Sequence, residues 1–213
     1  MTRSVLYQIA AAVLVIGGVL TAAATLLAPQ GNARAAVASG SYYPVAIAVL
    51  IGGLLVMSGW PAVYLRQREQ SGVLGFVGMA MVLISGLLLT VAFPLIQLLI
   101  YPWINNLSIS TKTLSDGPAS FNIFFAVTSG IVSIGGILFG IATLRAKVFS
   151  RTLGIGMIVL AASSFVLGFL SLPGGGGIHM SWWWATTGTF GVLVYMVALA
   201  WYGIELFQRV GEV

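Results

Sequence analysis

The sequence predicts an all-α polytopic membrane protein that forms a single transmembrane helical domain over residues 1–213. Three observations lead to this class. Hydrophobic residues make up 59% of the chain and charged residues 6%, whereas a soluble domain carries about 25% charged residues. Long apolar stretches follow one another along the chain, and two of the segments between them repeat one short basic phrase. Most of the protein surface is therefore expected to face lipid.

The apolar stretches are expected to be six transmembrane helices, because about 20 mostly apolar residues cross the hydrocarbon core as a helix. None of them contains Asp, Glu, Lys or Arg, and their ranges are 5–28, 42–65, 72–101, 119–144, 152–172 and 182–204. Strands are not expected, because an open strand leaves its backbone groups without partners in lipid. The first stretch imitates a secretory signal, but its apolar run is longer than a signal core, so we expect it to remain a helix.

The repeated phrase predicts a duplication. Leu, Arg, Ser, Leu and Gly recur at the same internal spacing in segments 65–75 and 144–154, and each segment lies between two apolar stretches. Each is interpreted as a turn that joins two helices. Helices 2–3 and 4–5 would then be two parallel copies of one hairpin, flanked by helices 1 and 6. Parallel repeats occur in some transporters, but they also occur in proteins that transport nothing.

Basic residues predict the orientation, because cytoplasmic loops carry an excess of Lys and Arg. If both termini lie inside, seven of the nine basic residues are on the inner side, and Arg34 and Lys112 are outside. The inner turns hold five of them: Arg66, Arg68, Arg145, Lys147 and Arg151. We therefore expect a multi-pass protein of the cell membrane with both termini cytoplasmic. The net charge of +5 contains no long basic run, so the expected partners are the bilayer and membrane subunits, or a second copy, and not nucleic acid.

Small residues predict where the helices pack, since close approach rather than apolar burial drives association in lipid. One stripe at helical spacing runs along the fourth stretch, and the fifth stretch offers further small positions. These residues are Ser129, Ser133, Gly136, Gly140, Thr143, Gly154 and Gly168. The favoured interpretation is bundle packing. The alternative is that the stripe lines a path for a substrate.

Few residues could carry chemistry. The chain has no cysteine and one histidine, His179, so thiolate chemistry, bis-histidine haem ligation and a multi-histidine metal site are excluded. His179 could still be a single axial ligand to haem or chlorin. The alternative is a loop histidine at the headgroup level. Three consecutive tryptophans, Trp182, Trp183 and Trp184, are expected at the outer membrane interface. We therefore expect no metal, no catalytic residues and no enzymatic activity.

An acidic residue, a proline and a set of aromatic residues give three further predictions. Glu205 is expected near the inner membrane surface, paired with Arg209 four residues on or with an arginine of an inner turn; a gating or proton-uptake role is the alternative. Pro94 predicts a kink in the third helix, because it lacks a backbone donor. Four aromatic residues are expected as anchors toward the inner interface: Trp60, Tyr64, Trp201 and Tyr202.

The segment from Leu138 to Arg145, with Leu153 and Gly154 beyond it, has the pattern LFGxATLR…LG. This pattern is similar to one found in uncharacterised bacterial six-helix integral membrane proteins. The resemblance implies a multi-pass protein of the bacterial inner membrane and no particular activity. The function expected from the residues is a non-enzymatic accessory or scaffold subunit of a membrane assembly. The alternatives are a small transporter or channel for an uncharged or lipid-like solute, and a pigment-, haem- or quinone-associated subunit.

Overall fold

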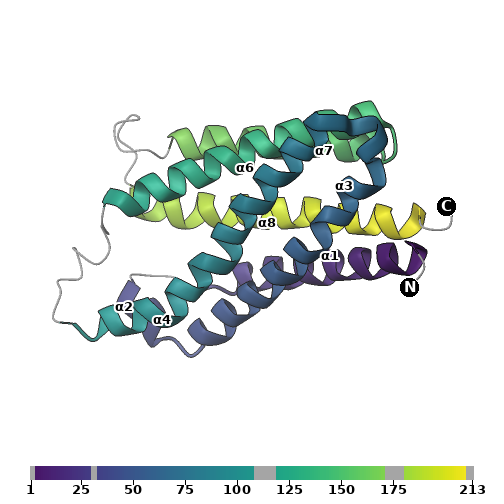
Figure 1. Ribbon diagram of the computed structural model, residues 1–213. Coiled ribbons are helices and arrows are strands. Elements are labelled where there is room, and N and C mark those ends of the chain that lie inside the picture. Colours follow the sequence, from purple (N-terminus) through teal and green to yellow (C-terminus); the bar gives the residue numbers. More distant parts are fainter. Residues whose placement is uncertain (1–2, 30–32, 108–118, 171–179, 210–213) are drawn as a thin grey trace.

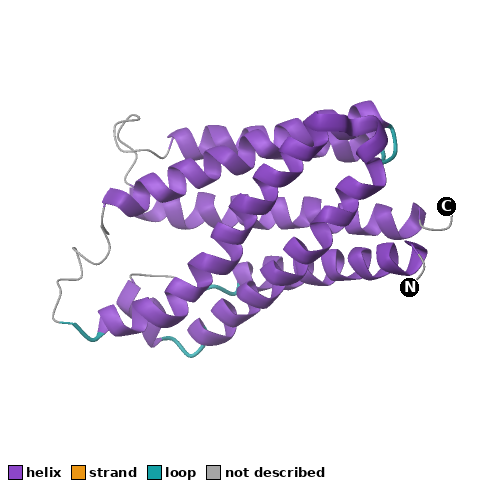
Figure 2. Ribbon diagram, viewed as in Figure 1, coloured by secondary structure: helices purple, strands orange, loops and turns teal. Residues whose placement is uncertain are grey.

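The computed structural model describes residues 3–29, 33–107, 119–170 and 180–209. Their regular structure is helical, and the part of the chain described contains no strand (Figures 1 and 2). The elements are α1 (Arg3–Leu26), α2 (Ala33–Ala38), α3 (Tyr42–Leu87), η1 (Leu88–Ala92), α4 (Phe93–Asn105), α6 (Ala119–Ala146), α7 (Arg151–Leu170) and α8 (Met180–Gln208). The expected all-α class is confirmed.

Within the described residues, three segments are long and apolar enough to cross a membrane: Ser4–Leu26, Tyr42–Asn105 and Ala126–Ala146. A shorter apolar helix runs over Arg151–Ser163. The segment Tyr42–Asn105 has 64 residues, about three times the length that a single crossing needs. It contains both the second and the third predicted stretches, and the chain reverses direction within it.

The reversal inside α3 takes place at Gly72. Its backbone has φ 55° and ψ −147°, a region that only glycine enters without strain. A Cβ at this position would meet nothing within 4 Å, so the backbone conformation, and not lack of space, requires glycine. The expected loop between the second and third helices is therefore a one-residue reversal, after which the chain folds back along itself (Figure 1).

The second turn is built differently. Helix α6 ends at Ala146, Lys147 has φ 56°, and α7 begins at Arg151. The side-chain oxygen of Ser150 accepts the Leu153 backbone N–H at 3.2 Å, which caps the start of α7. In Figure 1 both reversals lie at the same end of the bundle as the N and C labels. We call this end the turn end; it comprises residues 66–72, 145–151 and 205–209.

Helical structure continues through Pro94. A π-helical turn, Leu88–Ala92, directly precedes it, and the helix resumes as α4. The hydroxyl of Thr90 donates to the Gly86 carbonyl at 2.7 Å. A proline removes the backbone donor that would bond four residues back, and wider π turns commonly accommodate such an irregularity. The kink that we expected at Pro94 stays a prediction, and the backbone feature that the structure shows beside it is the π turn before α4.

Three copies of the sequence Ile-Gly-Gly-x-Leu begin at residues 16, 51 and 134, and their glycines make close helix contacts. Neighbouring residues on a helix point about 100° apart, so the two glycines of a pair face different neighbours. In α1, a Cβ at Gly17 would lie 2.6 Å from the Gly52 carbonyl oxygen of α3. A Cβ at Gly18 would lie 2.8 Å from the Met196 carbonyl oxygen of α8. One glycine pair thus joins α1 to two helices.

The pair in α6 works in the same way. A Cβ at Gly78 of α3 would lie 2.9 Å from the Gly135 carbonyl oxygen, and a Cβ at Gly136 would lie 2.8 Å from the Ala161 Cβ of α7. Three of these four contacts are with backbone oxygens, and the fourth is with the Ala161 Cβ, which cannot rotate away, so a side chain at any of the four glycines would push the helices apart. The double glycines therefore set the spacing between α1, α3, α6, α7 and α8.

Aromatic side chains fill the centre of the bundle. The rings of Trp60 and Phe139 have centroids 4.6 Å apart, and Tyr202 lies 5.5 Å from Trp60 and 5.7 Å from Phe139. Trp60 and Tyr202 are both 0% exposed. The expectation that these two residues anchor the inner interface is wrong, because both are directed inward and belong to the core.

Candidate functional site

Buried polar groups gather at the turn end around Glu205 of α8. The carboxylate, with the residue only 7% exposed, accepts the backbone N–H of Ser150 at 2.7 Å and also the Ser150 hydroxyl. Ser150 directly precedes α7, whose N-terminus carries a partial positive charge that favours an anion. Glu205 thus binds α8 to the start of α7 through charge-assisted hydrogen bonds.

Two arginines border this carboxylate. The Arg209 Nε lies 4.0 Å from a carboxylate oxygen of Glu205, and Arg66 Nη2 donates to the Arg209 carbonyl at 3.2 Å. The expected Glu205–Arg209 pair is therefore present but long, and the Ser150 contacts are much closer. The hydrogen bond from Arg66 to the Arg209 carbonyl brings the first turn against the end of α8.

A neutral hydrogen-bonded group lies one layer deeper. The Gln67 amide nitrogen donates to the Thr143 hydroxyl at 3.3 Å, and that hydroxyl lies 3.0 Å from the Tyr202 hydroxyl. The three residues come from α3, α6 and α8, and each is at most 1% exposed. The side-chain oxygen of Gln67, Oε1, has no hydrogen-bond partner. This group joins three helices, and its chemistry is hydrogen bonding without ionisation.

Five buried hydroxyls in the described residues have no hydrogen-bond partner: those of Thr21, Ser71, Ser85, Ser133 and Tyr195. Ser133 Oγ on α6 and the Tyr195 hydroxyl on α8 make no hydrogen bond. The Tyr195 oxygen would lie 3.2 Å from a Cβ at Gly136, so it points at the small-residue face of α6. Buried polar groups usually have hydrogen-bond partners, and these two hydroxyls lack them.

The predicted stripe on α6 faces more than one neighbour. A Cβ at Gly140 would lie 2.8 Å from the Gly154 carbonyl oxygen of α7, so these two glycines meet backbone to backbone. Gly136 also faces α7, whereas Thr143 faces α3 and α8. Ser129 is half-buried. Gly168 lies in the backbone of α7, but its surroundings lie outside the described part of the structure.

The residues predicted to orient the chain all lie at the turn end. Arg66 is half-buried, and the other four are exposed: Arg68, Arg145, Lys147 and Arg151. Their role in membrane orientation remains a prediction. His179 lies outside the described residues. Trp182, Trp183 and Trp184 lie in the first turn of α8, and their side chains are outside the described part. Among the described residues, no group of His, Cys, Asp and Glu could hold a metal ion.

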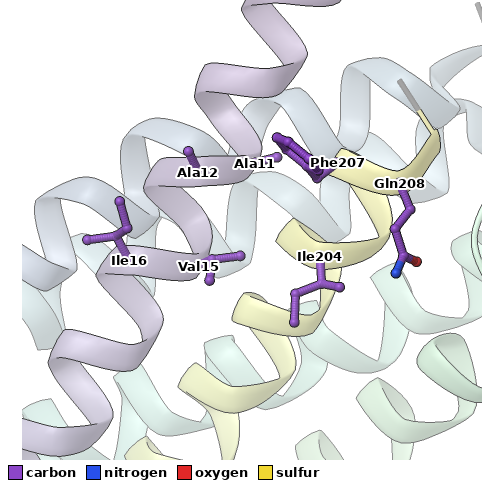
Figure 3. Close-up of a pocket in the computed structure, with 7 residues that line it drawn as sticks. All are labelled: Ala11, Ala12, Val15, Ile16, Ile204, Phe207 and Gln208. Carbon is purple, nitrogen blue, oxygen red and sulfur yellow. The ribbon is translucent and has the colours of Figure 1, made fainter. Parts of the chain in front are cut away.

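A groove of about 350 Å³ runs along the outside of the bundle between α1 and α8 (Figure 3). Its lining is almost wholly apolar, with one amide. The groove is lined by Ala12, Val15 and Ile16 of α1, among others, and by Ile204, Phe207 and Gln208 of α8.

The described part of the chain is all-helical and contains three apolar helices of membrane-spanning length. Comparisons with protein families, with curated proteins and with solved structures find no match.

Sequence reasoning missed two features of this arrangement. The first is the set of contacts made by Gly17, Gly18 and Gly52, although the threefold Ile-Gly-Gly-x-Leu pattern was a readable signal for them. The second is Gln67, a neutral polar residue between two arginines, which gave no sign that it points inward.

Proposed function

We propose that the protein is a non-enzymatic accessory or scaffold subunit of a membrane assembly. It crosses the bilayer six times with both termini cytoplasmic, and its two hairpins derive from a duplication. Support for this topology comes from the turn end, where both reversals lie together with the start of α1 and the end of α8 (Figure 1) and where four basic side chains are exposed. In the duplication, the two turns have diverged, since one reverses at Gly72 and the other over residues 147–150.

One observation carries the scaffold proposal: α7 presents a glycine outward. A Cβ at Gly156 would meet nothing within 4 Å, whereas both glycines of each double-glycine pair face another part of the bundle. Thr152, Val159 and Ser163 share the outer face with Gly156, and all three are exposed. Small residues on a lipid-facing helix allow a second helix to approach closely. This face of α7 is the proposed contact with a partner subunit.

The filled interior also favours a structural role over transport. The hairpins meet backbone to backbone, since a Cβ at Gly78 would lie 2.9 Å from the Gly135 carbonyl oxygen. Trp60, Phe139 and Tyr202 occupy the centre beside this contact. A solute passing between the hairpins would have to separate these groups.

The test is the mass of the particle purified in mild detergent, measured by mass photometry. We expect a complex heavier than one chain, and we expect Gly156→Leu to reduce it to the mass of a single chain. The matched control is Gly130→Leu on α6, where a Cβ also meets nothing within 4 Å but the exposed neighbours on the same face, Val127 and Ile134, are bulky. A wild-type particle that is a bare monomer, or a Gly156→Leu complex of unchanged mass, would contradict the proposal.

A path for an uncharged or lipid-like solute is the second candidate. The unpartnered hydroxyls of Ser133 and Tyr195 favour it, since they could bind a passing polar group. Swelling of proteoliposomes in neutral solutes measures it, and Ser133→Val with Tyr195→Phe should then abolish swelling. A haem, chlorin or quinone role would rest on His179, and a colourless purified protein would dismiss haem and chlorin.

A further inference from the structure

We propose that the groove between α1 and α8 binds one acyl chain of an anionic phospholipid, whose headgroup is held at the turn end. This inference rests on the proposed membrane topology but not on the scaffold role. The first argument is the chemistry of the groove. Its α1 side is Ala12, Val15 and Ile16, and its α8 side begins with Ile204 and Phe207 (Figure 3). The volume of about 350 Å³ lies within the range of about 300–1,000 Å³ that is typical of ligand pockets.

The second argument is the depth of the groove. Ala12 and Ile16 lie 9 and 13 residues after Arg3, which at 1.5 Å per residue places them roughly 14 and 20 Å from the start of α1. The hydrocarbon core is about 30 Å thick. The groove therefore extends from the turn end only to about the middle of the bilayer. A lipid of one leaflet fits this length.

The third argument is the charge at the open end. Gln208 is the one polar residue of the lining, and Arg209 follows it in the chain. Arg66 lies beside them, with its Nη2 3.2 Å from the Arg209 carbonyl oxygen. Of the acidic residues that the structure describes at the turn end, Glu69 is exposed, and Glu205 is buried, accepts hydrogen bonds from Ser150 and lies 4.0 Å from Arg209. Basic residues near a membrane surface attract anionic headgroups, so the groove favours phosphatidylglycerol over phosphatidylcholine.

The experiment is native mass spectrometry of the protein released from nanodiscs that contain equal amounts of phosphatidylglycerol and phosphatidylcholine with identical chains. We expect one retained phosphatidylglycerol. Ala12→Phe fills the groove at an exposed position and should abolish retention. Arg66→Gln and Arg209→Gln should each reduce the preference for phosphatidylglycerol about fivefold. The control is Val77→Phe, at an exposed position of α3 near the turn end and away from the groove lining. This variant should retain the lipid.

Three results would overturn the inference. The first is equal retention of both lipids. The second is retention that survives both Ala12→Phe and the arginine substitutions, which also guards against an Ala12→Phe chain that does not fold. The third is loss of a second protein chain, instead of a lipid, on Ala12→Phe, since this would assign the groove to a helix. A protein that carbonate removes from membranes would instead refute the proposed topology. A protein that stays in membranes but retains no phosphatidylglycerol refutes only the lipid site.

Discussion

Replacing Gly140 with alanine tests the close contact between α6 and α7. The added Cβ would lie 2.8 Å from the Gly154 carbonyl oxygen and 2.6 Å from Ile158 Cγ1, and ordinary contact begins at 3.4 Å. The Ile158 side chain can rotate, but the carbonyl belongs to the backbone. Helix α7 must therefore move by 3.4 − 2.8, or about 0.6 Å, at this point. Overpacking of this kind costs about 1–3 kcal/mol.

Alanine also raises helix propensity by about 1 kcal/mol relative to glycine, which would partly conceal the cost. The matched variant Gly130→Ala lies on the same helix, gains the same propensity and meets nothing within 4 Å. The difference between the two variants therefore isolates the packing term. Thermal unfolding in one detergent, followed by tryptophan fluorescence, should place Gly140→Ala lower by about 2–4 °C for each kcal/mol. Equal unfolding temperatures, or a higher one for Gly140→Ala, would refute the close contact.

Three further substitutions test the turn end and the core by the same unfolding measurement. Glu205→Gln should lose about 1–3 kcal/mol, because Ser150 exchanges a charged acceptor for a neutral one; an unchanged transition would show that the carboxylate is not needed. Tyr202→Phe should cost about 1 kcal/mol by removing a buried hydrogen bond, whereas Tyr195→Phe should cost nothing, because its hydroxyl has no partner; equal losses would mean that Tyr195 is bonded after all. Gly72→Ala should cost about 1–3 kcal/mol through its positive φ, and a neutral result would contradict the one-residue reversal.

The sequence was a good guide to the positions of the two reversals but not to their construction. The repeated phrase places arginine, serine and glycine at both sites. One copy reverses at Gly72, and the other turns over residues 147–150. When the two copies are aligned, Gly72 of the first corresponds to Arg151 of the second. The backbone region that glycine permits is therefore closed to the second copy at this position.

The direction of helix faces could not be predicted, for a physical reason. In a soluble helix the polar side marks the surface, but in lipid both the core and the surroundings are apolar. Trp60 and Tyr202 were therefore expected at the interface, although both are fully buried. Glycine pairs are an exception. Because glycine has no side chain, it indicates where two helices can approach closely, in water or in lipid.

Contacts between distant segments were the least accessible to sequence reasoning. Spacing along one helix suggested Arg209 as the partner of Glu205. Its closest contacts are instead with Ser150, 55 positions away, because the turn after α6 brings that backbone N–H to the end of α8. No periodicity within a single helix encodes such a meeting.

The most direct test of the central claim, that these helices cross a bilayer with the turn end inside the cell, uses the absence of cysteine from the chain. Single cysteines replace Gly40, Glu69 or Thr152, which are exposed, and intact cells are treated with a membrane-impermeant maleimide. The account predicts labelling at position 40 in intact cells, and at positions 69 and 152 only after the membrane is permeabilised. Labelling at 69 or 152 in intact cells, or a protein recovered in the soluble fraction, would contradict it.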